Sequence, residues 1–212
     1  MSNEVATIEE TTPQPNVINY TPIFPVLTAQ VLLDLPLSDM VEDALKMASD
    51  TKNSDAGYST FFNNQDLGSI RDVSKLREAI YGVCCAFGRE LKFETNYDKS
   101  SIHLWLNVTR RGDHHPPLLH QRSVFAGIFH ARIQEDIGPI VLLNPTASLR
   151  GHEPFVEPQD QGPFTASAIS LSPVLNTLHI WPAWMMSSIP ALTVSGPYIS
   201  FGFTIDFLPP GA

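Results

Sequence analysis

Hydrophobic positions along the chain follow two different periods, and the period changes near residue 100. Between residues 38 and 49 and between residues 72 and 91, apolar side chains recur every three or four positions, as on one face of a helix. Ser38 is suited to cap the first of these helices. From residue 100 onward, the apolar residues fall in short runs rich in β-branched and aromatic side chains, which predict strands. The predicted strands cover residues 102–109, 124–132, 140–143, 177–181 and 198–207.

The last predicted strand shows the clearest alternation. Large residues such as Phe201 and Phe203 alternate with small or polar residues such as Ser200 and Gly202, which indicates a strand with two unlike faces. Two helices followed by a run of short strands predict an antiparallel sandwich or barrel, with the helices packed against one sheet.

The first 25 residues differ from the rest of the chain. They are acidic and contain four prolines, which predicts an extended arm, because proline fixes φ and lacks a backbone donor. Tyr20, Ile23 and Phe24 give the end of this arm apolar anchors that could dock on another subunit. We therefore expect an arm over residues 1–25 and a single domain over residues 26–212.

Charge and composition exclude several functions. The formal net charge is −9, and no Lys or Arg occurs in residues 1–45 or after Arg150. The densest basic cluster, Arg110–Arg111, is too small for a nucleic-acid surface. No apolar run approaches the roughly 20 residues of a membrane span, and the first residues lack the features of a signal peptide. The adjacent Cys84 and Cys85 predict small buried groups rather than a disulfide framework, which favours a reducing cytoplasm.

Histidines offer the only candidate metal ligands. His114, His115 and His120 lie close together in the sequence and could bind zinc or iron, with His179 as the remote ligand. The alternative is a proline-stiffened loop with solvent-facing imidazoles, and a hydrogen-bonded strand histidine at position 179. His130 and the other histidines are isolated and carry no signal. No nucleophile motif, P-loop or dinucleotide-binding glycine pattern is present.

An uncharged apolar run extends from Trp181 to Val194. Part of it must be core, but part of it should face outward in a sandwich, and a large exposed apolar patch usually marks an interface. We therefore expect Trp184, Met185 and Met186 to lie at a subunit interface.

Several segments, in a fixed order and spacing, resemble a known family. They are Gly57–Thr60, Asp66–Leu67, Trp105–Val108 followed by Gly112, His120 with Ser123–Phe129, Asn144–Pro145, Ile180–Trp184 and Ile199–Phe203. From about residue 20 to the end, the chain resembles the 2-oxoglutarate/Fe(II)-dependent oxygenases of bacteria and cyanophages. The resemblance implies a mainly β fold, a double-stranded β-helix (jelly roll) with the two N-terminal helices packed on one sheet.

The resemblance also implies a set of catalytic positions, and this chain departs from the family at three of them. The family's first metal-binding His falls on Leu118, and only its partner on the same strand, His120, remains. The distal His falls on Ser187. The Arg that pairs with the far carboxylate of 2-oxoglutarate falls on Tyr198. A buried dicarboxylate without a cation would cost several kcal/mol.

These departures favour a non-catalytic jelly roll that serves as a structural or interaction protein and takes no cofactor. The occurrence of the family in cyanophages points to a virion component, such as a capsid cement or decoration protein or a neck or tail subunit. The expected partners are protein subunits in a homo-oligomer or a larger assembly, with a virion location if the chain is phage-encoded and a cytoplasmic one otherwise. Two alternatives stay open. One is an active oxygenase that uses Fe(II) and 2-oxoglutarate with ligands drawn from His114, His115, His120 and His179, and the other is a pocket that binds a metal or small ligand without turnover.

Overall fold

The computed structural model describes residues 26–49, 57–62, 65–146 and 166–208. The arm expected over residues 1–25 and most of the polar segment between Pro145 and Pro163 lie outside these ranges. The elements in chain order are β1 (Ala29–Leu32), α1 (Leu37–Ser49), β2 (Tyr58–Ser59), α2 (Val73–Glu90), β3 (Asn96–Thr109), β4 (His115–Leu118), β5 (Phe125–Arg132), β6 (Ile140–Leu143), β7 (Ala168–Leu171), β8 (Thr177–Pro182), β9 (Ser187–Ile189) and β10 (Tyr198–Leu208).

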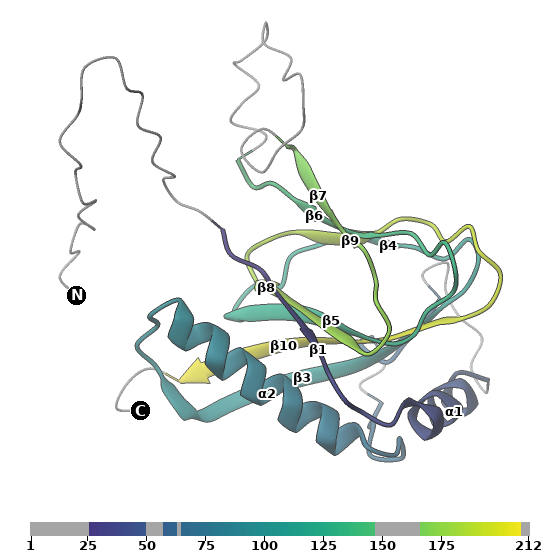
Figure 1. Ribbon diagram of the computed structural model, residues 1–212, viewed down its shortest axis with the longest axis horizontal. Coiled ribbons are helices and arrows are strands. Elements are labelled where there is room, and N and C mark those ends of the chain that lie inside the picture. The colour runs from purple at the N-terminus through teal and green to yellow at the C-terminus, as the bar shows by residue number, and fades with distance from the viewer. Residues whose placement is uncertain (1–25, 50–56, 63–64, 147–165, 209–212) are drawn as a thin grey trace, which may run out of the picture.

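The strands form two antiparallel sheets that face each other (Figure 1). The larger sheet has the order β1-β8-β5-β10-β3-β2, and the smaller has the order β4-β9-β6-β7. From β3 onward the chain passes back and forth between the sheets, apart from the β6–β7 hairpin, which stays in the smaller one. This alternation is the jelly-roll connectivity that the resemblance implied, and the expected fold class is confirmed.

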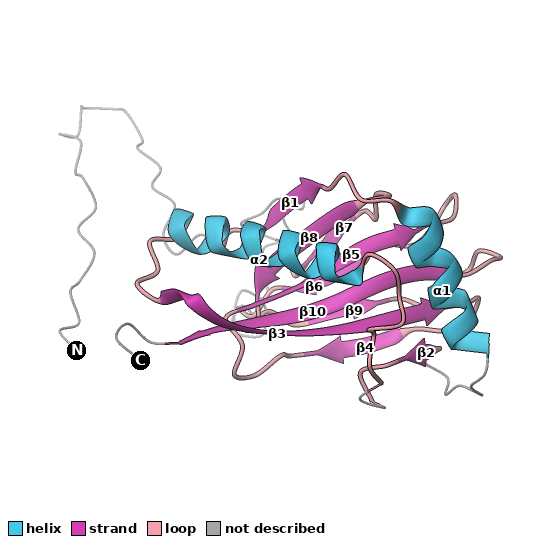
Figure 2. Ribbon diagram, turned by 90° about the horizontal axis from the view of Figure 1, so that it is seen from below, coloured by secondary structure: helices cyan, strands magenta, loops and turns pink. Residues whose placement is uncertain are grey.

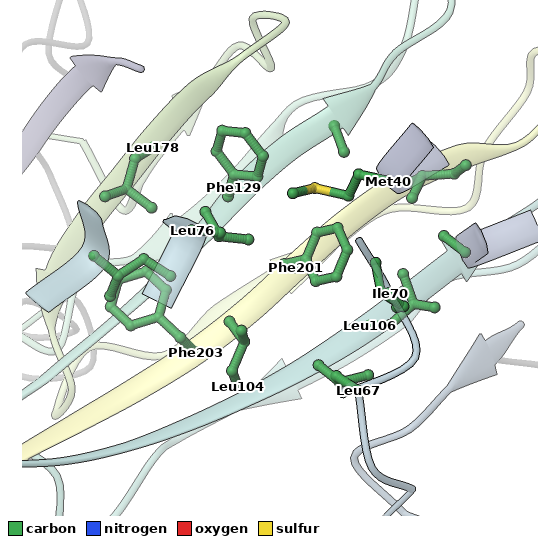
Figure 3. Close-up of a cluster of buried hydrophobic side chains, with 14 of the residues drawn as sticks. Met40, Leu67, Ile70, Leu76, Leu104, Leu106, Phe129, Leu178, Phe201 and Phe203 are labelled. Atoms are coloured by element: carbon green, nitrogen blue, oxygen red, sulfur yellow. The ribbon is translucent and has the colours of Figure 1, made fainter. Parts of the chain in front are cut away.

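Both helices cover the outer face of the larger sheet (Figure 2). Met40 from α1 and Leu76 from α2 are fully buried there, and they pack in one cluster with Phe129, Phe201 and Phe203 from the sheet (Figure 3). Fully burying a side chain of this size contributes about 1.5–3 kcal/mol, so this layer supplies much of the folding free energy. The two unlike faces predicted for β10 are thereby explained, since its phenylalanines face the helices.

The inner face of β10 carries small and polar residues instead. Ser200 and Thr204 are buried there, and Tyr198 joins a second cluster between the sheets that contains Ile128 and Trp181. The sheet therefore separates a wholly apolar core under the helices from a mixed interior between the two sheets.

The five predicted strands and both predicted helices are present, with small differences at their ends. Helix α1 begins at Leu37, so Ser38 lies in its first turn rather than at its cap.

Five further strands were not predicted: β1, β2, β4, β7 and β9. Strand β4 contains Pro116 and Pro117, which indicated a loop. Proline is tolerated there because β4 is an edge strand that pairs only with β9.

Cys84 and Cys85 are buried in α2 as free thiols, as expected. Burial raises the pKa of the Cys84 thiol, so it stays protonated and unreactive. Within the described ranges, neither helix has the length and apolar character needed to cross a membrane.

Candidate functional site

A cavity of about 70 Å³ is lined by residues from both sheets. The larger sheet and the loop after β2 contribute mainly aromatic and small residues, and the smaller sheet contributes aliphatic and hydroxyl side chains. The lining residues are Ser59, Phe61, Phe62, Trp105, Asn107, His115, Leu118, His120, Gly127, Ile128, Ile140, Trp181, Ser187, Ser188, Ile189 and Gly202.

The three positions that the resemblance assigns to metal ligands meet at this cavity. Leu118 at the end of β4 pairs directly with Ser187 at the start of β9. His120, two residues after β4, lines the same cavity as both of them. Leu118 and Ser187, 69 positions apart in the sequence, are thus neighbours across one strand pair.

The side chains at these positions do not fit iron. Non-haem iron sites of this type use two histidines and a carboxylate. Here His120 is the only one of the three that offers a strong ligand atom, since Leu118 has none. In the described part of the chain, no three His, Cys, Asp or Glu side chains come together as a metal-binding group.

Tyr198, the position to which the resemblance assigns the carboxylate-binding Arg, is fully buried on β10. Its hydroxyl lies 2.7 Å from Nδ1 of His130, whose Nε2 lies 2.9 Å from Nδ1 of His179. Burial, and then the neighbouring His179, lower the pKa of His130 to about 3, and burial also lowers the pKa of His179 and raises that of Tyr198. All three groups are therefore neutral near pH 7.

These neutral groups form one continuous hydrogen-bonded chain. Each neutral imidazole offers one donor and one acceptor nitrogen, so the protons can be ordered in either direction, from Tyr198 toward His179 or from His179 toward Tyr198. No sequence pattern around His130 indicates this network, because its partners lie 49 and 68 residues away in the chain. A neutral hydrogen-bonded chain is thus found at the position to which the resemblance assigns a cation.

Aromatic rings form one wall of the cavity. The ring of Phe61 lies 5.0 Å from Trp105, 5.5 Å from His103 and 6.3 Å from His120, measured between centroids. Trp105 lies over Gly202 on the next strand, where a Cβ atom would come within 2.4 Å of its Nε1. The missing side chain at Gly202 therefore makes room for the indole of Trp105.

The two histidines of the cavity are neutral at pH 7. Burial, together with His103, lowers the pKa of His120, and burial, together with His114, lowers that of His115. His115 is held by a 3.3 Å contact between its Nε2 and Oγ1 of Thr109. His115 is half-buried, whereas the loop interpretation predicted a solvent-facing imidazole at this position.

The structure separates the other predicted site residues. His114 is exposed, and His179 does not line the cavity. His179 lies on β8 as a hydrogen-bonded strand histidine, which was one of the two interpretations of this residue.

Among the interface candidates, Trp184 and Met186 are exposed, whereas Met185 is only 5% exposed and packs in the core between the sheets. The remaining candidates, Tyr20, Ile23 and Phe24, lie outside the described residues.

Comparisons with known proteins bear on the family and the fold. Residues 103–204 match the family described as "Putative 2OG-Fe(II) oxygenase", and the resemblance to that family is confirmed. No curated protein sequence matches the chain.

Solved structures show the same fold. A prolyl-4-hydroxylase from Pseudomonas putida is 11% identical, with a TM-score of 0.56 over 87% of this chain and 93% of that one. AviO1 from Streptomyces viridochromogenes Tue57 is also 11% identical, with a TM-score of 0.57 over 88% and 91%. The epimerase SnoN in complex with Fe³⁺, alpha-ketoglutarate and nogalamycin RO is 11% identical, with a TM-score of 0.53 over 87% and 82%.

Proposed function

We propose that this relative of the 2OG-Fe(II) oxygenases is a non-catalytic jelly roll, a structural or interaction protein that keeps the fold and has lost the chemistry. The observation that carries the proposal is the cavity at which Leu118, His120 and Ser187 meet. It has the position of a metal site, but one strong ligand remains of three.

Electrostatics of the cavity support the same conclusion. The described residues that line it include no Lys or Arg, and Tyr198 stands at the position of the family's cation. Binding a dicarboxylate there would leave two negative charges out of water without a counter-charge, at a cost of several kcal/mol. Neither the metal nor the co-substrate of an oxygenase is matched by the residues present.

The direct test is turnover. Purified full-length protein, supplied with iron(II), ascorbate and 2-oxoglutarate, should release no succinate above a protein-free blank, and elemental analysis should find no stoichiometric iron. Succinate release that disappears in a His120→Ala variant would overturn the proposal and restore the oxygenase with atypical ligands.

The interaction part of the proposal concerns assembly. The exposed Trp184 and Met186 support it, as do the apolar anchors Tyr20, Ile23 and Phe24 of the arm. We expect a homo-oligomer or a larger assembly, and a place in the virion if the chain is phage-encoded.

Deletion of residues 1–25, which removes all three of these arm residues, tests this part. It should leave the thermal unfolding of the domain unchanged and reduce the mass measured by light scattering after size exclusion. A truncated protein that assembles as well as the full chain would remove the support for the arm as an interaction segment. Mass spectrometry of purified particles tests the virion location.

A further inference from the structure

We infer that the outer edge of β1 is the surface on which the arm of a second copy docks, with residues 16–21 of that arm added to the larger sheet as a further strand. The inference rests on the proposed function, because it names the surface and the segment that make the expected contact between subunits. Three observations lead to it: an unpaired strand edge, exposed apolar side chains beside this edge, and a short uncharged segment of the arm that is suited to a strand.

Strand β1 is at one edge of the larger sheet, and among the described strands it pairs only with β8 (Figure 2). The backbone N–H of Leu33 donates to the carbonyl oxygen of Asn176, at 2.8 Å, on the β8 side. Alternate residues of an antiparallel strand bond toward opposite sides, so the N–H and C=O groups of Gln30 and Leu32 point away from β8. In the described part of the chain, no strand pairs with these outward groups.

The other sheet edges are less suited to an added strand. Strand β4 contains Pro116 and Pro117, which lack N–H donors, and β2 has only two residues. Strand β7 carries one exposed large apolar side chain, that of Ile169.

Exposed apolar side chains are concentrated along β1 instead. Leu32, which is 72% exposed, is opposite Thr177 of β8, and the N–H of Thr177 donates to the carbonyl oxygen of Val174 in the preceding turn. Of the thirteen exposed large apolar residues in the described ranges, five lie on or beside β1: Val26, Leu27, Leu32, Val174 and Leu175. A strand docked here would therefore cover apolar surface as well as pair with the backbone.

The arm contains a segment with the properties of such a strand. Residues 16–21, Asn-Val-Ile-Asn-Tyr-Thr, lie between Pro15 and Pro22 and contain neither proline nor a charged residue. Four of the six are β-branched or aromatic, the types that strands favour. In a strand, Ile18 and Tyr20 share one face and can cover the apolar side chains beside β1.

Charge favours the same pairing. Each copy has a formal net charge of −9, so two copies repel each other wherever their acidic surfaces meet. Residues 26–33 of the edge contain no charged side chain, and neither do residues 16–21 of the arm. A contact between these two segments avoids the repulsion.

The connection between the segment and β1 favours a second copy over the chain's own edge. Pairing with its own β1 would make residues 22–28 the loop of a hairpin. Hairpin loops have about two to five residues, whereas this connection has seven, and Pro22 and Pro25 bias it toward extended conformations. An extended connection of this length spans roughly 20 Å, which carries the segment to a neighbouring molecule.

One variant on each side of the contact tests the inference in the full-length protein. Ile18→Pro in the arm and Leu32→Lys on the edge should each lower the mass measured by light scattering as much as deletion of residues 1–25 does, with the unfolding midpoint nearly unchanged. The matched controls are Ile8→Pro, outside the segment, and Leu119→Lys, an exposed residue that follows β4 on the opposite side of the sandwich (Figure 2). Both controls should assemble like the wild type.

Mixing the two variants identifies the molecule to which the arm binds. The Leu32→Lys chain keeps an intact arm and the Ile18→Pro chain keeps an intact edge, so the mixture should form a heterodimer that neither variant forms alone. Hydrogen exchange measures the pairing itself. The amides of Gln30 and Leu32 should exchange about tenfold or more slowly in the wild type than in Ile18→Pro, while those of β7 exchange alike in both.

Each contrary result has a distinct meaning. If deletion of residues 1–25 lowers the mass but Ile18→Pro and Leu32→Lys do not, the arm docks elsewhere and the inferred edge is wrong, although the proposed interaction stands. If the variants lower the mass but their mixture forms no heterodimer, the assignment to a second copy is wrong. If the deletion itself leaves the mass unchanged, the interaction part of the proposed function fails.

Discussion

Leu118 on β4 pairs with Ser187 on β9. Strand β4 is at the edge of the smaller sheet and has four residues, and its neighbour β9 has three. Both side chains line one cavity together with His120. The pairing places side by side two positions to which the resemblance assigns metal ligands, and the third, His120, lines the same cavity.

The first prediction is that the metal site can be rebuilt. In the double variant Leu118→His/Ser187→His, three imidazoles should converge on the cavity and bind Co²⁺ or Ni²⁺ with an affinity at least tenfold above that of the wild type, because imidazole is a good ligand for both ions. Isothermal titration and the visible absorption of bound Co²⁺ measure this.

The control for the rebuilt site is Leu119→His/Ser187→His. Leu119 is exposed and does not line the cavity, so this variant adds the same number of histidines without completing the site. Equal metal affinity in the two double variants would contradict the assignment of position 118.

The second prediction concerns acid. The pKa of His130 is about 3 in the fold and roughly 6.5 in an unfolded chain, so between these values only the unfolded state is protonated. Stability is therefore fully present above pH 6.5 and falls as the pH decreases toward 3, by up to about 1.4 kcal/mol per pH unit. A His130→Gln variant should show a shallower decrease in urea-measured unfolding free energy between pH 6.5 and 4.

The control variant is Ser170→Gln, which alters an exposed residue of β7 that does not titrate and should keep the wild-type pH dependence. The comparison uses slopes, so it stays valid even if His130→Gln lowers the stability at every pH. Identical slopes for wild type and His130→Gln would show that the buried histidine is not the group responsible.

The third prediction concerns Gly127. A Cβ atom at this position would lie 2.3 Å from the backbone oxygen of His179 and 2.4 Å from the ring of Phe203. Because a backbone atom of the neighbouring strand cannot move aside as a side chain can, Gly127→Ala should lower the unfolding free energy by about 1–3 kcal/mol or more. Chemical denaturation measures the loss.

Gly82→Ala serves as the opposite case. A Cβ atom there meets nothing within 4 Å, and the residue lies inside α2. Alanine is favoured over glycine within a helix, so this variant should gain about 0.5–1 kcal/mol. Destabilisation by both substitutions to the same degree would mean that the tight packing at Gly127 is not the cause.

The fourth prediction separates interface from core in the segment after β8. Trp184 is 52% exposed and Met185 is 5% exposed. Trp184→Ser should reduce self-association in analytical ultracentrifugation and leave the unfolding midpoint nearly unchanged. Met185→Ala should lower the unfolding free energy by about 2–5 kcal/mol, because it removes buried apolar volume. If Trp184→Ser assembles like the wild type, the surface around Trp184 is not an interface.

Several features of this protein are determined by the sequence alone. The 3–4 spacing in α1 and α2 and the alternation in β10 specify local structure, because each residue's environment there follows from its neighbours in the chain. The absence of Lys and Arg after Arg150 is also evident without a structure.

Only the tertiary structure decided which distant residues meet. Strands β4 and β9 were missed because they are short, and because Pro116 and Pro117 indicated a loop, yet their pairing brings Leu118 to Ser187. In the sequence His130 has no candidate partner, whereas in the fold it lies between Tyr198 and His179 and contacts both. The sequence predicts the same interface position for Met185 as for Trp184 and Met186, but packing buries Met185 and leaves the other two exposed. Such contacts arise between segments tens of residues apart, and periodicity within a segment carries no information about which other segment it will face.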